Sequence, residues 1–264
     1  MTQAVSRALP PLVFITGASG GIGQALAARY AKEGWRLALV ARRTAEVQAW
    51  AGREGLAPER WAVFAADVQH VDSIVGAGQA CINTMGLPDV VIASAGISVG
   101  VDTAVRADID VLAEVLATNV TGLAATFQPF VAAMRERGSG ALVGVASVAA
   151  IRGLPGHAAY CASKAGVVAY CESLRVECRA SGVRVVTLLP GYIDTPLTAR
   201  NPYSMPFLMS AKAFADQAFT AIARGSSYRV IPWQMAVVAK VLRALPNFIY
   251  DRAMADRGRK PRKS

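Results

Sequence analysis

Short apolar runs alternate with helix-length amphipathic segments along the first 230 or so residues of the chain. Most of the short runs are nearly continuous in Val, Leu, Ile and Ala, which is typical of parallel strands covered by helices on both faces. Strands are predicted at Leu12–Thr16, Arg36–Ala41, Trp61–Ala66, Val90–Ser94, Ala141–Ala146, Val183–Leu189 and Tyr228–Pro232. Helices are predicted at Ile22–Glu33, Thr44–Glu54, Asp72–Met85, Ile109–Arg137 and Ala158–Ser181. This alternation predicts an α/β fold with a doubly wound parallel sheet.

The chain is long enough to bury a sizeable core, and one domain with a small C-terminal appendage is the simplest organisation for its 264 residues. We assign residues 1–232 to the α/β domain and residues 233–264 to an amphipathic, basic extension. In the extension a helix is predicted at Trp233–Leu245, with Met235, Val238 and Leu242 on one side. The composition, 53% hydrophobic and 17% charged, is that of a globular protein.

A glycine-rich turn, Thr16-Gly17-Ala18-Ser19-Gly20-Gly21-Ile22-Gly23, lies between the first predicted strand and the first predicted helix. Glycine permits a tight turn and lets the backbone approach a ligand closely. The exposed N–H groups at the start of the helix favour an anion. In this strand–turn–helix setting the turn predicts a site for the pyrophosphate of a dinucleotide.

The second strand ends in Val40-Ala41-Arg42-Arg43, without a carboxylate. NAD enzymes of this architecture place an acidic residue there to accept hydrogen bonds from the ribose. Two guanidinium groups suit a 2′-phosphate instead, because arginine pairs bidentately with phosphate oxygens. Ser19 adds a hydroxyl group for the same phosphate. We therefore expect NADP(H), and a solvated basic loop is the alternative interpretation.

Tyr160 and Lys164 lie four residues apart in a predicted helix, so the ammonium group can sit beside the phenol. Free tyrosine titrates near ~10, and a neighbouring positive charge brings its pKa toward the range of an acid/base catalyst. Ser147 lies thirteen residues before Tyr160. The glycine turn, Ser147 and the Tyr160–Lys164 pair together resemble the classical short-chain dehydrogenase/reductase family, over about residues 12 to 200.

The resemblance implies a Rossmann-type domain that transfers hydride between a nicotinamide and a carbonyl or secondary alcohol. Tyr160 is then the acid/base, and Ser147 orients the substrate oxygen. Lys164 binds the nicotinamide ribose, and Asn119 bends its helix and holds a water for proton relay. The cofactor site expected in full is Gly17, Ser19, Gly21, Ile22, Gly23, Arg42, Arg43, Asp67, Val68, Ala95, Gly96, Tyr160, Lys164, Ile193 and Thr195.

Two segments differ from, or vary within, the family pattern. Ala93 and Ser94 stand where the family carries two asparagines, which puts the side-chain bracing of the central sheet in doubt. Residues 192–211 occupy the place of the variable substrate lid. The apolar side chains of this lid predict either an apolar or lipid-like substrate or simple packing on the core.

Two other functional classes stay open beside an NADP(H)-dependent oxidoreductase. A dinucleotide-binding sensor or scaffold needs no acid/base, so the complete set of Asn119, Ser147, Tyr160 and Lys164 argues against it. A related epimerase or dehydratase uses the same Tyr and Lys, but usually in a longer chain. The resemblance also implies a homo-oligomer, a dimer or tetramer, with contacts through the helix that carries Tyr160.

Charge is concentrated near the C-terminus, since residues 224–264 carry ten Lys or Arg and two Asp, or +8 of the net +10. The aromatic interleaving or recognised module of a nucleic-acid-binding protein is missing, so we expect no nucleic acid partner. The apolar and basic extension has the ingredients of a peripheral membrane anchor, and a core-packed terminal helix is the preferred alternative.

Cysteine and histidine positions favour neither a metal site nor a hydrolase. The four cysteines have no metal-ligand spacing and predict reduced thiols in a cytoplasmic protein. With only His70 and His157 in the chain, a metal or Ser-His site is disfavoured. We expect His70 to be exposed. His157 lies close to Tyr160, but a surface loop is its preferred interpretation.

Overall fold

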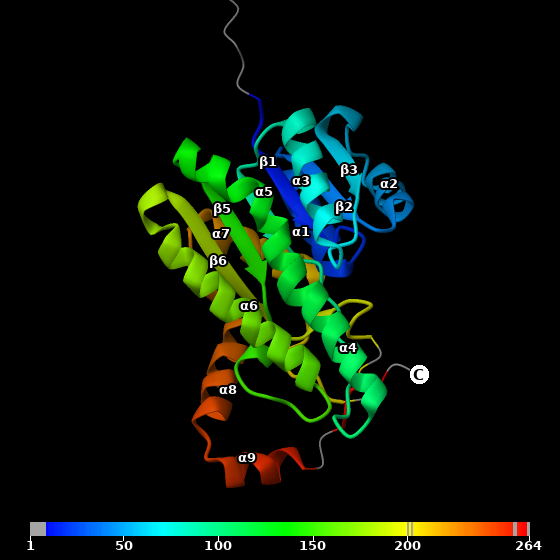
Figure 1. Ribbon diagram of the computed structural model, residues 1–264, viewed down its shortest axis with the longest axis vertical. Helices are drawn as coiled ribbons and strands as arrows, with labels where there is room; N and C mark the ends of the chain where they lie inside the picture. Colours follow the sequence, from blue (N-terminus) through cyan, green and yellow to red (C-terminus); the bar gives the residue numbers. More distant parts are fainter. Residues whose placement is uncertain (1–8, 200, 202, 256–257, 263–264) are drawn as a thin grey trace, which may run out of the picture.

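A computed structural model of the protein describes residues 9–199, 201, 203–255 and 258–262. Its centre is a seven-stranded sheet in the order β3-β2-β1-β4-β5-β6-β9, and every neighbouring pair is parallel (Figure 1). The strands are β1 Leu12–Thr16, β2 Arg36–Ala41, β3 Trp61–Ala65, β4 Val90–Ala93, β5 Gly140–Val145, β6 Val183–Pro190 and β9 Tyr228–Ile231. The doubly wound, Rossmann-type fold predicted from the apolar runs is confirmed.

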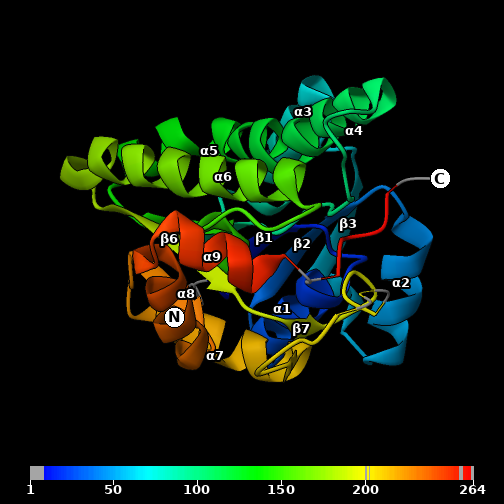
Figure 2. The ribbon, with the colours of Figure 1, turned by 90° about the horizontal axis from the view of Figure 1, so that it is seen from below.

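Helices cover both faces of the sheet, as Figure 2 shows: α3, α4, α5 and α6 lie on one side and α1, α2 and α7 on the other. Their bounds are α1 Gly21–Lys32, α2 Thr44–Arg53, α3 Val71–Met85, α4 Arg106–Leu116, α5 Gly122–Arg137, α6 Ala158–Glu177, α7 Ala211–Ala223, α8 Trp233–Ala244 and α9 Asn247–Met254. Strand β1 shows why its sequence is continuously apolar. Leu12 and Phe14 pack into the core on one face, and Val13 and Ile15 into the core on the other.

The helix predicted at Ile109–Arg137 contains an irregularity. It consists of α4, a π-helical turn at Ala117–Thr121, and α5. Together these are long and apolar enough to cross a membrane by length and composition alone. Leu123, Phe127 and Phe130 are buried in the core, so the helix packs in this fold as a core helix.

Four elements within the lid or after it were missed. Helix α7 packs against α1, and the short strands β7 Ile193–Asp194 and β8 Met209–Ser210 pair at the base of the lid. Helix α9 follows α8. The lid prediction includes residues 200 and 202, and the tail prediction includes residues 256–257 and 263–264, all of which lie outside the described residues.

The C-terminal extension is tied to the loop that precedes α6. Arg152 donates to the carbonyl oxygens of Leu242 and Leu245 and to the side chain of Asn247, where α8 meets α9. The guanidinium group also lies 3.8 Å from the ring centroid of Tyr250. These contacts satisfy carbonyls at the end of α8 and hold both helices against the α/β domain.

Candidate active site

The glycine turn lies at the carboxyl end of β1, beside β4, where the strand order reverses. Gly17 has φ +72°, and a Cβ on it would lie 2.9 Å from the Cα of Ala95. A Cβ on Gly23 would lie 2.2 Å from the Gly17 carbonyl oxygen. Helix α1 begins without a side-chain cap and without an acidic residue in its first turn, so its first amides face a site suited to an anion.

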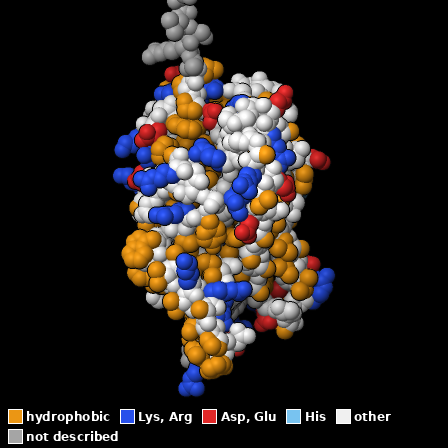
Figure 3. All heavy atoms as spheres, turned by 90° about the vertical axis from the view of Figure 1, so that its left-hand side faces the viewer, with side chains coloured by type: hydrophobic (Ala, Val, Ile, Leu, Met, Phe, Trp, Pro, Cys, Tyr) orange, Lys and Arg blue, Asp and Glu red, His pale blue; other side chains and the backbone are white. Residues whose placement is uncertain are grey.

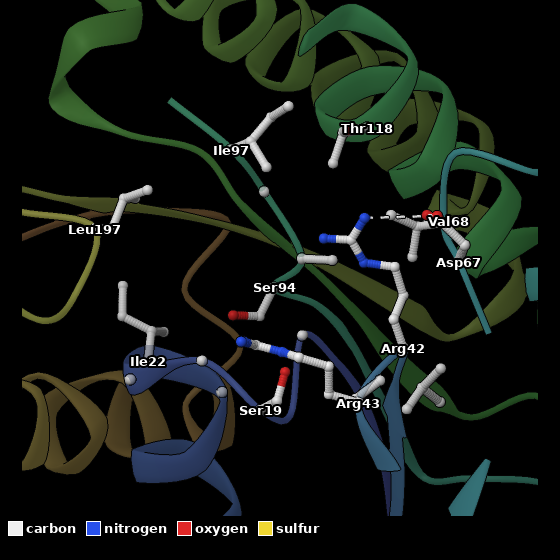
Figure 4. A pocket seen from close by; sticks show the side chains of 18 of the residues that line it. Ser19, Ile22, Arg42, Arg43, Asp67, Val68, Ser94, Ile97, Thr118 and Leu197 are labelled. Carbon is white, nitrogen blue, oxygen red and sulfur yellow. Dashed lines mark ion pairs between the residues drawn. The ribbon is translucent and has the colours of Figure 1, made fainter. Parts of the chain in front are cut away.

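A cavity of about 430 Å³, which we call the dinucleotide cavity, opens above this turn (Figure 4). Ile97, Thr118 and Leu197 form part of its lining beyond the predicted residues. The predicted cofactor residues that line it are Gly17, Ser19, Gly21, Ile22, Gly23, Arg42, Arg43, Asp67, Val68, Ala95, Gly96 and Thr195. Ile193 does not line the cavity, because its side chain is buried in the core on the α1 and α7 side.

Arg42 and Arg43 extend from the end of β2 into the cavity, as Figure 4 shows. The guanidinium group of Arg42 lies 3.6 Å from the Asp67 carboxylate, and that of Arg43 lies 3.2 Å from Glu46. Asp67 also accepts a hydrogen bond from the backbone N–H of Gln69, 3.0 Å away. Both arginine side chains are largely exposed, so these ion pairs are weak and each guanidinium can turn to a ligand phosphate.

Thr16 braces β1 against β4 at the floor of the cavity. Its hydroxyl oxygen accepts hydrogen bonds from the N–H groups of Ser94 at 3.2 Å and Ala95 at 3.3 Å. These bonds connect the central strands where the family pattern has asparagines and this chain has Ala93 and Ser94.

Asn119 is buried in the π-helical turn and connects three segments. Its Oδ1 accepts from the Ile97 N–H at 2.8 Å, while its Nδ2 donates to the Ile97 carbonyl and the Ser163 hydroxyl, both at 2.9 Å. Asn119 is 1% exposed and therefore does not face solvent. A π-helical turn adds a residue to the helix, and such turns are frequent at functional sites.

Lys164 is 5% exposed, and its ammonium donates to the carbonyl oxygen of Val145 at 2.8 Å. A Cβ on Gly96 would lie 3.4 Å from this ammonium and 3.2 Å from Asn119 Oδ1. Both groups therefore lie against Gly96, which lines the dinucleotide cavity, although Lys164 and Asn119 do not line it themselves. Burial lowers the pKa of Lys164 to about 8, which the neighbouring Cys171 partly opposes.

Tyr160 lies one turn before Lys164 on α6, with the ammonium 5.8 Å from its ring centroid. Burial raises the pKa of Tyr160, and hydrogen bonding with Ser147 partly opposes the rise. The expectation that Lys164 lowers this pKa is therefore wrong, because burial decides its direction. The phenol is protonated at neutral pH, as a proton donor must be.

Ser147 and Tyr160 line a second, smaller space of about 70 Å³, which we call the substrate-side pocket. It touches the dinucleotide cavity at Leu197, which lines both. Ser147 follows β5, and its Oγ accepts from the N–H of Ala149 at 3.2 Å. The strand end therefore points the hydroxyl group toward the same space as the Tyr160 phenol.

His157 is buried, contrary to its preferred assignment to a surface loop. Its Nε2 lies 2.9 Å from the hydroxyl of Tyr203, and its Nδ1 lies 2.9 Å from the carbonyl oxygen of Pro155. Tyr203 comes from the lid, which closes over the imidazole and forms a wall of the substrate-side pocket. His70, by contrast, has a side chain that is 75% exposed, as predicted.

The sequence analysis missed Asn201, Tyr203 and Lys260 as lining residues of the substrate-side pocket. Two belong to the lid, where no local pattern marks a contact residue. Lys260 belongs to the basic tail, and no feature of the sequence distinguishes it from the other Lys and Arg residues there. Within the described residues, no group of three or more His, Cys, Asp or Glu side chains is arranged to hold a metal ion.

Comparison with known proteins identifies the family to which this chain belongs. The family model described as short chain dehydrogenase matches residues 11–204. An uncharacterized oxidoreductase of Myxococcus xanthus is 39% identical over 239 residues, which cover 90% of this chain and 94% of that protein. The protein belongs to the short-chain dehydrogenase family and is an oxidoreductase.

Two solved structures show the same fold with a nicotinamide cofactor. The 3-ketoacyl-(acyl-carrier-protein) reductase from Brucella melitensis, complexed with NADH, has a TM-score of 0.76 and 26% identity, over 84% of this chain and 96% of that one. The alcohol dehydrogenase from the archaeon Thermococcus sibiricus, complexed with 5-hydroxy-NADP, has a TM-score of 0.74 and 23% identity, over 84% and 96%. Family and fold together establish a nicotinamide dinucleotide as the cofactor.

Proposed function

We propose that the protein is an NADP(H)-dependent carbonyl reductase or alcohol dehydrogenase that uses Tyr160 as its acid/base. One observation carries the proposal. Lys164 and Asn119 lie against Gly96, which lines the dinucleotide cavity, while Tyr160 and Ser147 line the substrate-side pocket next to it. A protein that only binds the dinucleotide could use Lys164 and Asn119, but it would not need Tyr160 and Ser147.

The residues around the cavity fit the cofactor. The amides at the start of α1, which no side chain caps, suit the pyrophosphate, and the close approach of Gly17 to Ala95 packs the turn against the segment after β4. Asp67 and Val68 line the cavity and would contact the adenine, while Thr195, which lies against Gly21, would contact the nicotinamide. Arg42 and Arg43, without an acidic residue at the end of β2, favour the 2′-phosphate of NADP(H) over the free ribose of NAD(H).

The proton step follows from the positions of three side chains. A bound nicotinamide would supply the hydride that reduces the carbonyl carbon, or would accept the hydride that leaves the alcohol carbon in oxidation. Tyr160 donates its phenolic proton to the carbonyl oxygen as the alcohol forms, and in the reverse direction it takes the proton back. Ser147 donates a hydrogen bond to the same oxygen and stabilises its developing negative charge. The Lys164 ammonium stabilises the phenolate that remains.

The substrate expected here is a carbonyl compound with an apolar body. Val148, Leu154 and Tyr192 line the substrate-side pocket and also a neighbouring apolar hollow beside Met235 and Leu242 of α8. Aliphatic side chains on both sides favour a hydrocarbon portion next to the reacting carbon.

The direct test is a fluorescence titration with NADPH and NADH, followed by an absorbance screen with apolar ketones and aldehydes. Tight binding of NADPH and its oxidation by at least one carbonyl compound are the expected results. Tyr160→Phe is the matched variant, and it should lower kcat by about 10²- to 10⁴-fold while NADPH affinity stays within about twofold. Turnover by Tyr160→Phe at the wild-type rate would remove Tyr160 from the chemistry.

Two further functional classes correspond to other outcomes of the same screen. NADPH binding without oxidation across the panel would favour a dinucleotide sensor or scaffold. Product formation without a net change in cofactor absorbance would favour an epimerase or dehydratase.

We also propose that the enzyme is a cytoplasmic homo-oligomer with peripheral membrane contact. The four cysteines are free and buried, which fits a reducing compartment. An open groove between α5 and α6, lined by Ala124, Val131, Tyr170 and Leu174, supports subunit contact through these helices. Exposed apolar side chains on α8 and α9 support the membrane contact.

A further inference from the structure

The tail residues Gly258–Arg262 contact segments far away in the sequence, and Lys260 among them lines the substrate-side pocket. The N–H of Gly100 donates to the carbonyl oxygen of Pro261 at 2.9 Å, and Gly100 forms a β-bridge with Arg262. A Cβ on Gly100 would lie 2.1 Å from the Lys260 carbonyl oxygen, so only glycine allows this approach. This tail lies beyond the residues that the family model matches.

A buried carboxylate anchors the tail. Asp108, near the start of α4, is 3% exposed and pairs with the Arg262 guanidinium through two bonds of 2.7 and 3.1 Å. Asp108 also accepts from the N–H of Asp102 at 2.6 Å. The hydrogen bond with Arg262 holds the pKa of Asp108 below its usual range. A charge-assisted bidentate pair fixes position as well as adding stability, so the tail is held in one register.

The anchored tail places Lys260 in the wall of the pocket. Its ammonium donates to Asn201 Oδ1 at 2.6 Å and lies 3.4 Å from the Leu197 carbonyl oxygen, and both residues line the same pocket. These partners are neutral, and among the described residues Lys260 forms no ion pair. The other tail cations with described side chains are paired, Arg259 with Asp102 and Arg262 with Asp108.

The remaining lining of the pocket is formally neutral within the described part of the chain, apart from the imidazole of His157. The Lys260 ammonium is half-buried and has lost part of its hydration. Neutral hydrogen-bond partners do not fully compensate for that loss. An anionic ligand oxygen at this point would supply the missing countercharge.

We propose that Lys260 is a specificity residue that binds an anionic group of the carbonyl substrate, while Arg262 and Asp108 position it by anchoring the tail. The inference rests on the proposed function, and it gives that function a substrate class. The substrate is a carbonyl compound with an apolar body and an acidic group, which lies at the pocket mouth while the carbonyl oxygen faces Tyr160 and Ser147.

The test uses three carboxylates, 4-oxopentanoate, 5-oxohexanoate and 6-oxoheptanoate, each beside its methyl ester. Dissociation constants are measured by calorimetry on the full chain loaded with NADP⁺, and KM and kcat are measured with NADPH. We expect at least one carboxylate to bind about tenfold more tightly than its ester. Lys260→Met should bring the carboxylate-to-ester binding ratio close to one, with the change in KM rather than in kcat. Lys260→Arg should restore part of the preference for the carboxylate.

Two matched variants separate recognition from structure. Arg259→Met removes a positive charge from the adjacent, exposed position of the same tail and should leave the carboxylate-to-ester ratio within about twofold of wild type. Arg262→Met keeps Lys260 but removes the anchor of the tail, so this variant should lose the preference for the carboxylate over its ester. Thermal melting of each variant identifies any that fail to fold.

The two proposals fail in different ways. A carboxylate-to-ester binding ratio near one in the wild type, or an unchanged ratio in Lys260→Met, would overturn the role of Lys260 whatever the enzyme turns over. Selective carboxylate binding without NADPH oxidation would support Lys260 as the anion site and contradict the oxidoreductase step.

Discussion

Lys164 carries a positive charge in an almost fully buried position, with the Val145 carbonyl as its hydrogen-bond partner. Burial alone disfavours the ammonium, which explains a pKa of about 8. The group is therefore charged at neutral pH but loses its charge within the range where many proteins are still folded.

NADPH affinity should fall as the pH rises from 7 to 9.5, because neutral Lys164 no longer attracts the anionic cofactor. The loss should be on the order of tenfold, since one proton changes affinity at most about tenfold for each pH unit above its pKa. Burial raises the pKa values of Tyr160 and Cys171, so these neighbours stay neutral over most of the range. Fluorescence titrations across the pH series measure the slope, and Lys164→Met should give a flat profile.

Arg42 and Arg43 differ in their existing partners, which makes their single variants informative. Arg42 pairs with Asp67, which lines the dinucleotide cavity, and Arg43 pairs with the helix residue Glu46. Arg42→Ala and Arg43→Ala should each weaken NADPH binding by about tenfold and NADH binding by less than about twofold, because only NADPH carries a 2′-phosphate. Titration with both cofactors checks this, and equal losses for the two would contradict the phosphate assignment.

At the scale of elements, the β1–α1 turn depends on the close contact between Gly23 and Gly17. A Cβ at position 23 meets backbone rather than a flexible side chain, so the turn itself must move. The amides that face the pyrophosphate belong to this same turn, and their direction changes with it.

Gly23→Ala should lower NADPH affinity at least about tenfold and destabilise the fold by roughly 1–3 kcal/mol, as overpacking does. Gly76→Ala is the matched control, since a Cβ there has nothing within 4 Å and the residue lies inside α3. This control should gain about 0.5–1 kcal/mol from the better helix propensity of alanine. Chemical denaturation and NADPH titration of both variants provide the comparison, and equal affinities would argue against the turn as the pyrophosphate site.

Helices α4 and α5 show how an element carries a site residue. Asparagine inside a regular helix usually faces solvent or competes with the helix backbone. The π-helical turn instead carries Asn119 in a buried position, where it bridges the Ile97 segment after β4 and Ser163 on α6. Ser163 in turn donates to the Tyr160 carbonyl at 2.8 Å, so Asn119 helps to position the helix turn that carries the acid/base.

At the scale of the molecule, the C-terminal extension has two faces. Met235, Val238 and Leu242 pack toward the domain, as one side of the predicted helix. The opposite row, Trp233, Val237 and Val241, is more than half exposed, and Phe248 of α9 is 75% exposed. Figure 3 shows apolar side chains beside Lys and Arg on the lower end of the molecule, where α8 and α9 lie.

Trp233→Ser combined with Phe248→Ser should reduce co-sedimentation with liposomes that contain phosphatidylserine, because both side chains are large, apolar and exposed. Val176→Ser, which replaces an exposed apolar side chain on α6, is the control and should bind like wild type. Truncation after Leu245 is a poorer test, since it also removes the pocket wall at Lys260. Equal sedimentation of all three proteins would contradict the membrane proposal.

The sequence by itself determined the features that depend on local pattern and short spacing. The strands of the seven-stranded sheet, the glycine turn, the arginines that follow β2 and the Tyr160–Lys164 pair were all predicted, because each is visible within a few residues. Most boundaries shifted by at most one residue, but α4 begins three residues earlier and α6 ends four residues earlier than predicted. Helix α7, whose apolar face packs on α1, was missed.

Only the tertiary structure decided the contacts between distant segments. It turned Asn119 inward through a π-helical turn, buried His157 under Tyr203, and brought Lys260 to Asn201 across 59 residues. Arg262 finds Asp108 across 154 residues, and no spacing in the sequence encodes such a pair. The physical reason is that hydrophobic periodicity specifies which face of each element is buried, whereas the partner of a loop or tail residue depends on how all the elements pack.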